Sequence, residues 1–199
     1  MTDYTKEILT TLGLIVAFIG LIPYIVDIMH RRTKPYCFSW FIWSFLTGTA
    51  FFGQIADQGG AGAWVTAINS AMCFLIFFLS LKYGERIIKK SDWITFIAAL
   101  CAIPLWLATH TPLYSMILVT AIDMLGFYPT FRKSWNKPHE ETITAFALGS
   151  LMYAFGAAAL DRYTIITALY PISLVVTNAG FVLYVLWRRN VMLSQVRKL

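Results

Sequence analysis

The sequence predicts an all-α integral membrane protein with seven transmembrane helices, built as two parallel three-helix repeats joined by a linker helix. Hydrophobic residues make up 58% of the chain and charged residues only 13%, and the mean hydropathy is +0.66. This composition is typical of membrane proteins rather than soluble ones. Seven apolar stretches approach the roughly 20 residues that a membrane helix needs. The first three and the last three stretches also carry the same motifs in the same order.

The first repeat, 1–84, contains three of the predicted spans. They lie at 8–29, 36–56 and 62–83. Polar and basic residues separate these apolar runs, and the connections between them are short. Short connections favour antiparallel neighbours, so the first repeat is expected to start on one side of the membrane and end on the other.

The linker segment, 85–111, contains the fourth predicted span at 92–109, which has no counterpart in the repeat. The second repeat, 112–199, contains the remaining three spans. They lie at 112–131, 142–160 and 164–187. Because the linker helix crosses back, both repeats start on the same side, and together they form a single transmembrane domain over 1–199. Two parallel repeats of this kind commonly enclose a path between them.

The distribution of positive charge predicts the orientation. Fourteen of the 16 Lys and Arg residues fall on one side of this topology, and only Lys6 and Arg162 fall on the other. Basic loops stay in the cytoplasm, so the N-terminus is expected outside and the C-terminus inside. The net charge of +6 follows from this bias and from contact with anionic lipid, and it indicates no nucleic-acid partner. Short loops and a compact length favour a bacterial inner membrane.

A glycine and a proline occupy matched positions near the inner ends of the first and fifth spans. Gly20 and Pro23 correspond to Gly126 and Pro129. Proline removes a backbone hydrogen bond and kinks a helix, and glycine leaves room for close packing. The pairs therefore predict either two matched hinges of an inner gate or simple helix kinks.

One asparagine lies inside an apolar run in the third helix of each repeat, at Asn69 and Asn178. Counted from the inner end of each span, both lie near mid-membrane, where an unpaired amide is costly. Two interpretations follow. The amides face a central cavity and bind a polar solute, or they form hydrogen bonds between helices.

Asp123 lies close to the middle of the fifth span, and its counterpart in the first repeat is Ala17. Acidic residues within membrane helices usually mark substrate or proton pathways. We therefore predict that Asp123 binds solute or exchanges a proton. The alternative is a protonated acid that bonds to a neighbouring helix.

Two further positions carry weaker indications. Asp27 precedes Arg31 by four residues at the inner end of the first span, which predicts either a helical ion pair or a contact of the cytoplasmic gate. Trp40 and Trp43 are one turn apart near the inner end of the second span. Trp43 is expected to pack against neighbouring helices or to stack on a solute.

The chain resembles the SWEET and PQ-loop superfamily over essentially its whole length. The resemblance lies in the three-one-three arrangement of spans, the outside N-terminus, and the proline late in spans one and five. The Pro-Gln pair of that superfamily reads Pro23-Tyr24 and Pro129-Thr130 here. The resemblance implies a small-solute transporter with a central site.

The resemblance also implies which residues form the pocket. Its paired asparagines match Asn69 and Asn178. Its flanking tryptophans have no match: the second span has Phe51 and Phe52 in that zone, and the sixth has Tyr153 and Phe155. The chain is also similar to the PnuC family of bacterial vitamin transporters. Sugar, amino acid and vitamin precursor therefore all remain as expected substrate classes.

The expected function is alternating-access transport, with 1–84 rocking against 112–199, and a proton link through Asp123 is left open. No cofactor or metal site is expected, because no histidine has a partner at metal-ligand spacing. No enzyme is expected either, since the common nucleophile, zinc and phosphate-loop motifs are missing from the sequence. The alternative is a lipid-binding, receptor or scaffolding membrane protein. Partners are a small solute and lipid, with homo-oligomerisation left open.

Overall fold

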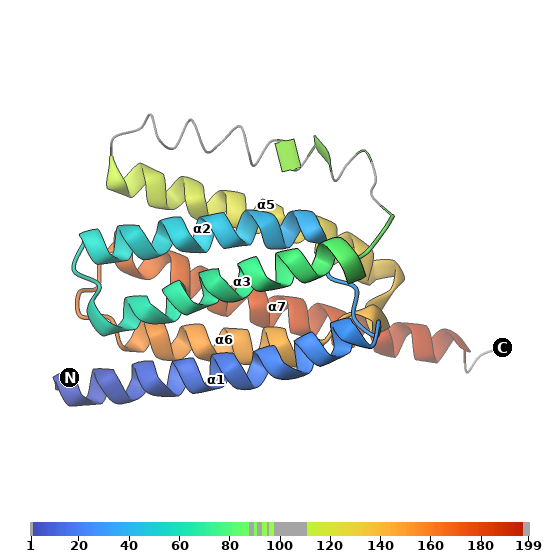
Figure 1. Ribbon diagram of the computed structural model, residues 1–199, viewed down its shortest axis with the longest axis horizontal. Coiled ribbons are helices and arrows are strands. Elements are labelled where there is room, and N and C mark those ends of the chain that lie inside the picture. The colour runs from blue at the N-terminus through green and yellow to red at the C-terminus, as the bar shows by residue number, and fades with distance from the viewer. Residues whose placement is uncertain (1, 88–89, 91–92, 95, 98–110, 197–199) are drawn as a thin grey trace.

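The computed structural model describes residues 2–87, 90, 93–94, 96–97 and 111–196, and within these residues the protein is helical with no strand. Six long helices form a bundle (Figure 1). They are α1 Asp3–Met29, α2 Cys37–Ala56, α3 Ala63–Tyr83, α5 Pro112–Asn136, α6 Ile143–Ala158 and α7 Ile165–Val196. Two short 3-10 helices, η1 Gly60–Gly62 and η2 Pro138–Glu140, precede α3 and α6.

These helices coincide with six of the seven predicted spans. The predicted fourth span, 92–109, lies mostly outside the described residues. Among the described residues, three segments are long and apolar enough to cross a membrane: Asp3–Met29, Gly60–Tyr83 and Ile165–Ser194. The all-helical fold and its apolar helices thus fit an integral membrane protein, and the seven-span topology stays a prediction.

α2 buries several polar side chains within the bundle. Ser39, Ser44, Thr47 and Gln54 are all fully enclosed. Each of them makes a hydrogen bond, for example from Gln54 Nε2 to the carbonyl oxygen of Thr167 on α7 at 3.1 Å. Buried polar groups are tolerated when they are bonded in this way.

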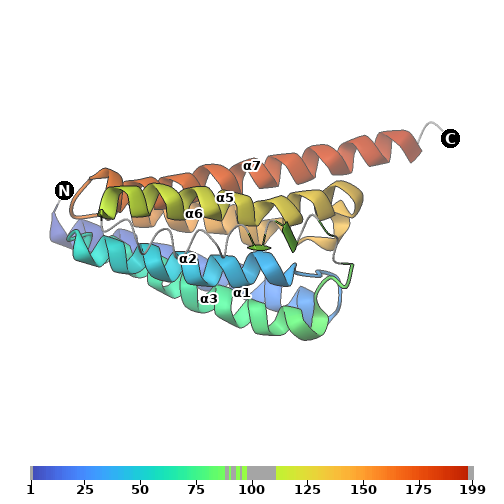
Figure 2. The same ribbon diagram turned by 90° about the horizontal axis from the view of Figure 1, so that it is seen from above.

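The helices form two layers of three, with α1, α2 and α3 in one layer and α5, α6 and α7 in the other (Figure 2). Within each layer the last helix packs against both others, α3 against α1 and α2, and α7 against α5 and α6. Between layers, α1 packs against α6 and α2 packs against α5. The packing pattern is therefore the same when α1, α2 and α3 are exchanged with α5, α6 and α7, respectively. α1, α3, α5 and α7 run in one direction, opposite to α2 and α6 (Figure 1).

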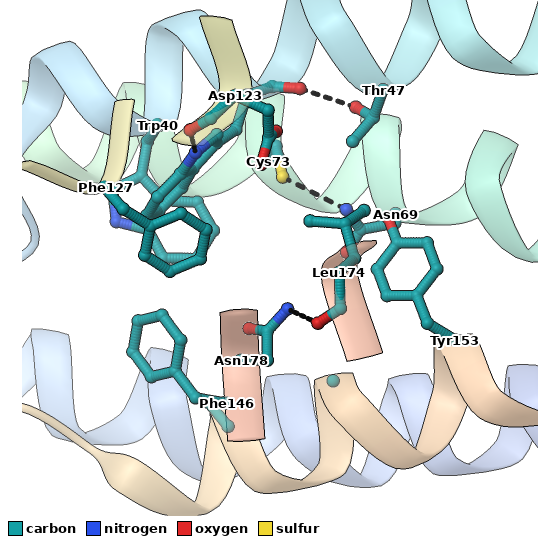
Figure 3. A pocket seen from close by; sticks show the side chains of 13 residues that line it. Trp40, Thr47, Asn69, Cys73, Asp123, Phe127, Phe146, Tyr153, Leu174 and Asn178 are labelled. Carbon is teal, nitrogen blue, oxygen red and sulfur yellow. Dashed lines mark hydrogen bonds between the residues drawn. The ribbon is translucent and has the colours of Figure 1, made fainter. Parts of the chain in front are cut away.

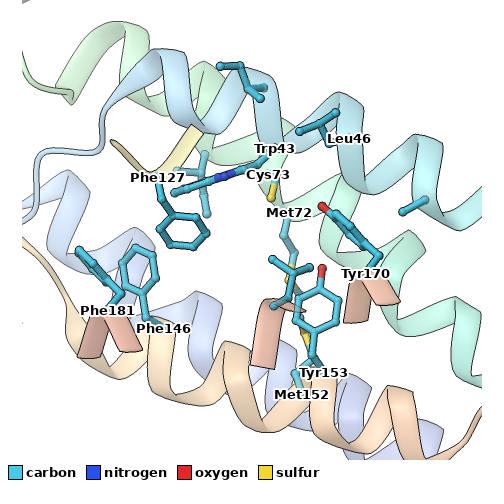
Figure 4. Packing of buried hydrophobic residues seen from close by; sticks show 14 of the residues in the cluster. Trp43, Leu46, Met72, Cys73, Phe127, Phe146, Met152, Tyr153, Tyr170 and Phe181 are labelled. Atoms are coloured by element: carbon cyan, nitrogen blue, oxygen red, sulfur yellow. The ribbon is translucent and has the colours of Figure 1, made fainter. Parts of the chain in front are cut away.

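The core lies between the two layers and is rich in aromatic side chains (Figure 4). Tyr24, Tyr153, Tyr170 and Phe181 are among its largest fully buried members. Many large apolar side chains point outward instead, including Phe18, Ile22, Phe78, Val176 and Leu183. Such extensive outward apolar surface is compatible with contact to lipid.

Basic side chains gather at the end of the bundle where α1 and α3 end and α2 and α6 begin. We call this end the basic end; Arg31, Lys34, Arg86, Lys137 and Arg189 lie there. The opposite, N-terminal end holds the start of α1 and contains Lys6 and Arg162. α7 is the longest helix, with 32 residues, and its last turns extend past the other helices at the basic end (Figure 1).

Candidate functional site

A cavity of about 80 Å³ lies between the two layers (Figure 3). Its polar lining comes from Thr47, Asn69, Cys73, Asp123, Tyr153 and Asn178. Its aromatic lining comes from Trp40, Trp43, Phe127 and Phe146. A cavity of this volume has room for several water molecules, each of which needs about 10–15 Å³. The packing of all five surrounding helices places these polar groups away from the outer apolar surface.

Five of the side chains predicted from the sequence meet in this cavity. Asn69 comes from α3, Asn178 from α7, Asp123 from α5, Trp43 from α2 and Tyr153 from α6. Both layers therefore contribute to its walls. The residues lie far apart in sequence, and only the packing of the layers brings them together.

Phe52 and Phe155, also predicted as pocket residues, do not line the cavity. Phe52 is 70% exposed on the outer face of α2, where it contacts Phe51. Phe155 is half-buried and packs beside Gly13 of α1. The reason is helical phase: side chains about one turn apart share a face, so Trp43 and Thr47 point inward whereas Phe52 lies on the opposite side.

The two asparagines bond within their own helices. Asn178 Nδ2 donates to the carbonyl oxygen of Leu174 at 2.7 Å, and Asn69 Nδ2 makes a long 3.5 Å contact with Cys73 Sγ. Asn69 also interacts with the Tyr153 hydroxyl group of α6 across the cavity, so the alternative of a contact between helices stays open for this amide. Asn178 Oδ1 points toward Gly149, where the missing side chain leaves space at the cavity wall. Both amides thus keep bonding capacity for a solute.

Asp123 is 1% exposed and lines the cavity. Its Oδ1 accepts a 2.8 Å hydrogen bond from the hydroxyl of Tyr170 on α7, and its main-chain oxygen accepts one from Trp43 Nε1 at 3.4 Å. No lysine or arginine among the described residues forms an ion pair with it. The expected bond to a neighbouring helix is present, and the carboxyl group also faces the cavity.

A second cavity of about 60 Å³ adjoins the first along α1. Trp40, Asn69 and Gly149 line both cavities, whereas Ala17 and Gly20 line the second alone. Ala17 is the position that corresponds to Asp123 in the repeat. The second cavity is accordingly apolar where the first carries a carboxyl group.

Among the residues that the structure describes, two buried tyrosine hydroxyl groups at these cavities have no hydrogen-bond partner of good geometry. They belong to Tyr153, in the wall of the first cavity, and to Tyr24, in the wall of the second. Both side chains are at most 2% exposed. Buried polar groups nearly always have a partner, often water or ligand, so each hydroxyl group has bonding capacity for a molecule that enters its cavity.

The four aromatic side chains form a closed ring on the cavity's side nearer to the basic end. Trp40 contacts Trp43, Trp43 contacts Phe127, Phe127 contacts Phe146, and Phe146 contacts Trp40, with ring centroids 4.5–6.5 Å apart. Sequence reasoning missed Trp40, Phe127 and Phe146 as wall residues. One signal was available: aligning Phe52-Gly53 with Phe155-Gly156 puts Phe146 opposite Trp43.

The matched glycines lie at the contacts between the layers. A Cβ atom on Gly126 would come within 3.0 Å of Trp43 Nε1, and one on Gly20 would come within 3.1 Å of the Leu148 side chain. Pro23 and Pro129 both lie inside their helices, one turn further on. The Ser39 hydroxyl donates to the carbonyl oxygen of Gly126 at 2.6 Å, which ties α2 to α5 just before the proline.

At the basic end, a buried lysine joins the two layers. Lys133 of α5 forms an ion pair with Glu141, and its ammonium group also donates to the carbonyl oxygens of Lys34 at 2.5 Å and Glu140 at 3.0 Å. Burial raises the pKa of the Glu141 carboxyl group, and the neighbouring Lys133 acts in the opposite direction. The side chain of Lys34 forms a 2.8 Å ion pair with Glu140. This cluster closes the bundle between the cavity and the basic loops.

Two further contacts reinforce this closure. Lys137 forms a 2.9 Å ion pair with Glu85. Burial opposes ionisation of Glu85, but bonds from Lys137 and from backbone amides outweigh it and leave the pKa of the carboxyl group lowered. Asp27 accepts a 2.7 Å hydrogen bond from Thr142 and lies 3.9 Å from Arg32.

The predicted helical ion pair of Asp27 with Arg31 is not formed. Arg31 adopts a left-handed conformation, with φ 57°, which ends α1 just beyond Met29 and takes its side chain out of the helical register. Asp27 therefore joins the contacts between layers through Thr142 rather than stabilising its own helix.

The N-terminal end is closed by ion pairs that also cross between layers. Lys6 of α1 pairs with Asp161 at 2.7 Å. In a second contact the acid comes from the other layer: Asp57 accepts hydrogen bonds from Arg162 at 3.1 Å and from the Thr164 hydroxyl at 2.5 Å. Asp57 and Asp161 are the two acids that follow the repeated Phe-Gly motif. The cavity is thus bracketed by contacts between the layers at both ends of the bundle.

Within the residues that the structure describes, no group of three or more His, Cys, Asp or Glu side chains is arranged to hold a metal ion. Comparisons with family models, with curated proteins and with solved structures found no match to this chain. The residues and their geometry therefore carry the functional argument alone.

Proposed function

We propose that this protein is a small-solute membrane transporter of SWEET or PQ-loop type, with one central site that opens alternately toward each side of the membrane. The observation that carries this proposal is the placement of the polar cavity between two layers of helices, with contacts between the layers on both sides of it. A scaffold needs no internal site with converging polar groups, whereas a carrier with alternating access does.

In this proposal the layers move against each other. Opening toward the basic end requires the Lys133–Glu141 and Lys137–Glu85 contacts to separate. Opening toward the N-terminal end requires the Lys6–Asp161 and Asp57–Arg162 contacts to separate. In this proposal, an arrangement with both sets of contacts formed lies between the two open states.

Asn69, Asn178 and Asp123 are proposed to bind the solute, with Tyr153 and Trp43 completing the site. Gly20 with Pro23, and Gly126 with Pro129, are proposed as hinges, and Asp27 as part of the inner gate. Sugar, amino acid and vitamin-like solutes all present groups that these amides can bond. A proton link through Asp123 is part of the proposal, and no catalytic role is assigned to any residue.

The proposed topology has seven spans, with the N-terminus outside and the C-terminus in the cytoplasm of a bacterial inner membrane. Support for it comes from the charge asymmetry between the two ends of the bundle. It is supported further by the common direction of α1, α3, α5 and α7 (Figure 1). Membrane lipid is the proposed partner of the outward apolar faces, and self-association remains open.

The test is reversible cross-linking of the closed N-terminal end. In a variant whose native cysteines are replaced, Lys6→Cys and Asp161→Cys are joined with a reducible thiosulfonate cross-linker in proteoliposomes. Uptake of a labelled metabolite panel should be saturable before cross-linking, stop after it, and return on reduction. The matched control carries only Lys6→Cys, and the reagent should leave its uptake unchanged. Absence of saturable uptake for the whole panel would favour a lipid-binding, receptor or scaffolding role.

A further inference from the structure

The two adjoining cavities differ in charge. Of the described residues that line them, Asp123 is the only one with a formal charge, and no lysine or arginine is among the lining residues. The second cavity has Ala17 at the corresponding position of the repeat. A molecule that fills both cavities therefore meets one acidic end and one largely apolar end.

The carboxyl group of Asp123 is only partly satisfied by the protein. Tyr170 donates to Oδ1, and among the described residues no group donates to the second carboxylate oxygen. The other titratable side chains in the wall, Cys73 and Tyr153, bring no positive charge. A buried carboxylate without a counter-ion carries a large desolvation cost, which attraction to a bound cation offsets.

The aromatic ring on the neighbouring wall adds a second attraction for positive charge. Trp40, Trp43, Phe127 and Phe146 form the closed ring described above. Figure 3 shows Trp40 and Phe127 on the same side of the cavity as Asp123, and Phe146 on the facing wall. The electron-rich faces of aromatic rings attract ammonium and related cations, most strongly where water is excluded.

We propose that the central site takes a small organic cation, with its ammonium or protonated heterocyclic group between Asp123 and the aromatic ring and its apolar part in the cavity along α1. This inference rests on the proposed transport function and narrows its substrate class. The unpartnered hydroxyl of Tyr24 lies in the wall of that apolar cavity and accommodates one polar substituent on the ligand. Anions are excluded, because no basic side chain offsets their repulsion by Asp123.

The experiment compares three probes with the same phenyl skeleton and different charge. They are 2-phenylethylamine, a cation at neutral pH, 2-phenylethanol, which is neutral, and 3-phenylpropionate, an anion. Binding to the purified full-length protein is measured by calorimetry and by tryptophan fluorescence, since Trp40 and Trp43 lie in the cavity wall. The amine should bind at least ten-fold more tightly than the alcohol, and the anion should bind weakest.

Two variants separate the charge of Asp123 from its structural contact. Asp123→Asn keeps the shape and the bond to Tyr170 but removes the charge, so the amine should lose its ten-fold advantage over the alcohol. Tyr170→Phe removes the hydrogen bond and keeps the charge, so the preference for the amine should persist. If Asp123→Asn does not fold, the charge order of the wild-type protein and of Tyr170→Phe still decides the question.

The outcomes distinguish this inference from the proposed function. Equal binding of amine and alcohol, or a preference for the anion, would overturn the cation site, and saturable uptake of a neutral metabolite would leave the transport proposal standing. The cation site would also be overturned if Asp123→Asn kept the preference for the amine over the alcohol. Saturable uptake of labelled 2-phenylethylamine, inhibited by other organic cations, would support both proposals together.

Discussion

The hydroxyl of Tyr170 donates a 2.8 Å hydrogen bond to Asp123, 47 residues away in sequence, and so joins α7 to α5 beside the central cavity. Both residues are almost fully buried, with Asp123 1% exposed and Tyr170 0% exposed. The bond lies within one layer of helices, so relative motion of the two layers does not break it. In the proposed transport cycle, Asp123 therefore stays fixed to its own layer.

Proton linkage is predicted for this fixed carboxyl group. If Asp123 gains and loses a proton during the cycle, wild-type uptake into proteoliposomes should respond to an imposed pH step. Asp123→Asn cannot titrate, so that response should vanish while exchange at saturating solute concentration persists. Wild-type uptake indifferent to the pH step would make the protein a facilitator and leave Asp123 as a ligand for solute alone.

Removal of either asparagine amide should weaken solute binding. Asn69→Ala and Asn178→Ala are each expected to cost about 1–3 kcal/mol in affinity, the typical cost of an unpaired polar partner. Folding should persist, because the Asn178 amide bonds within its own helix and Asn69 makes only a long contact with Cys73 beside its interaction with the Tyr153 hydroxyl. Asn136→Ala, at the exposed end of α5, is the matched control and should leave affinity unchanged. Loss of folding yield with intact affinity would assign the two amides a structural role.

Topology is predicted from the charge asymmetry. A cysteine introduced at Ser194 should react with impermeant thiol reagents from the cytoplasmic side, and one at Thr2 from the outside. Both positions are exposed at opposite ends of the bundle. Labelling of both from the same side would contradict the seven-span topology.

Close contact between α5 and α2 predicts opposite effects for two glycine substitutions. Gly126→Ala places a methyl group within 3.0 Å of Trp43 Nε1 and should destabilise the protein by about 1–3 kcal/mol, as overpacking does. Gly180→Ala meets nothing within 4 Å and should stabilise α7 by up to about 1 kcal/mol. Thermal unfolding in detergent measures both changes. Equal effects would show that Trp43 moves aside freely.

Acid should weaken the contact between Lys137 and Glu85. The pKa of Glu85 is lowered on folding, so the pair contributes stability above the ordinary glutamate pKa of about 4.3. That contribution is lost as the pH falls through the lowered value. Lys137→Met should therefore cost about 0.5–1 kcal/mol at pH 7 and progressively less as the pH falls through the lowered pKa of Glu85. A cost that does not change with pH would indicate packing by the lysine stem instead.

The sequence predicted the cavity's polar residues better than its aromatic ones. An amide or carboxyl group inside an apolar run has to face other protein groups, so Asn69, Asn178 and Asp123 converge regardless of detail. Large aromatic residues occur on both the inward and the outward face of a membrane helix. Their depth in the span therefore does not show whether the side chain faces the cavity. Phe52 was misplaced for this reason, and Phe146 was overlooked although the repeat aligns it with Trp43.

The contacts that close the two ends were beyond sequence reasoning. They join loops and helix ends, such as Lys133 with Glu141 and Lys6 with Asp161, whose relative position depends on how the layers pack. The left-handed turn at Arg31 also redirected Asp27 from a local partner to Thr142. Charge spacing along one helix carried no information about either outcome.

Because α7 is long, a small tilt of its layer would displace the C-terminal end of this helix by several ångströms. Its 32 residues correspond to about 48 Å, well beyond the roughly 30 Å hydrocarbon core of a bilayer. Arg188, whose guanidinium stacks 4.2 Å from the Trp135 ring, fixes this extension to the end of α5. A tilt of about 10° in the layer would swing the tip of α7 by about 8 Å. A spin label or fluorophore at that tip would thus read the state of a buried site from the aqueous phase.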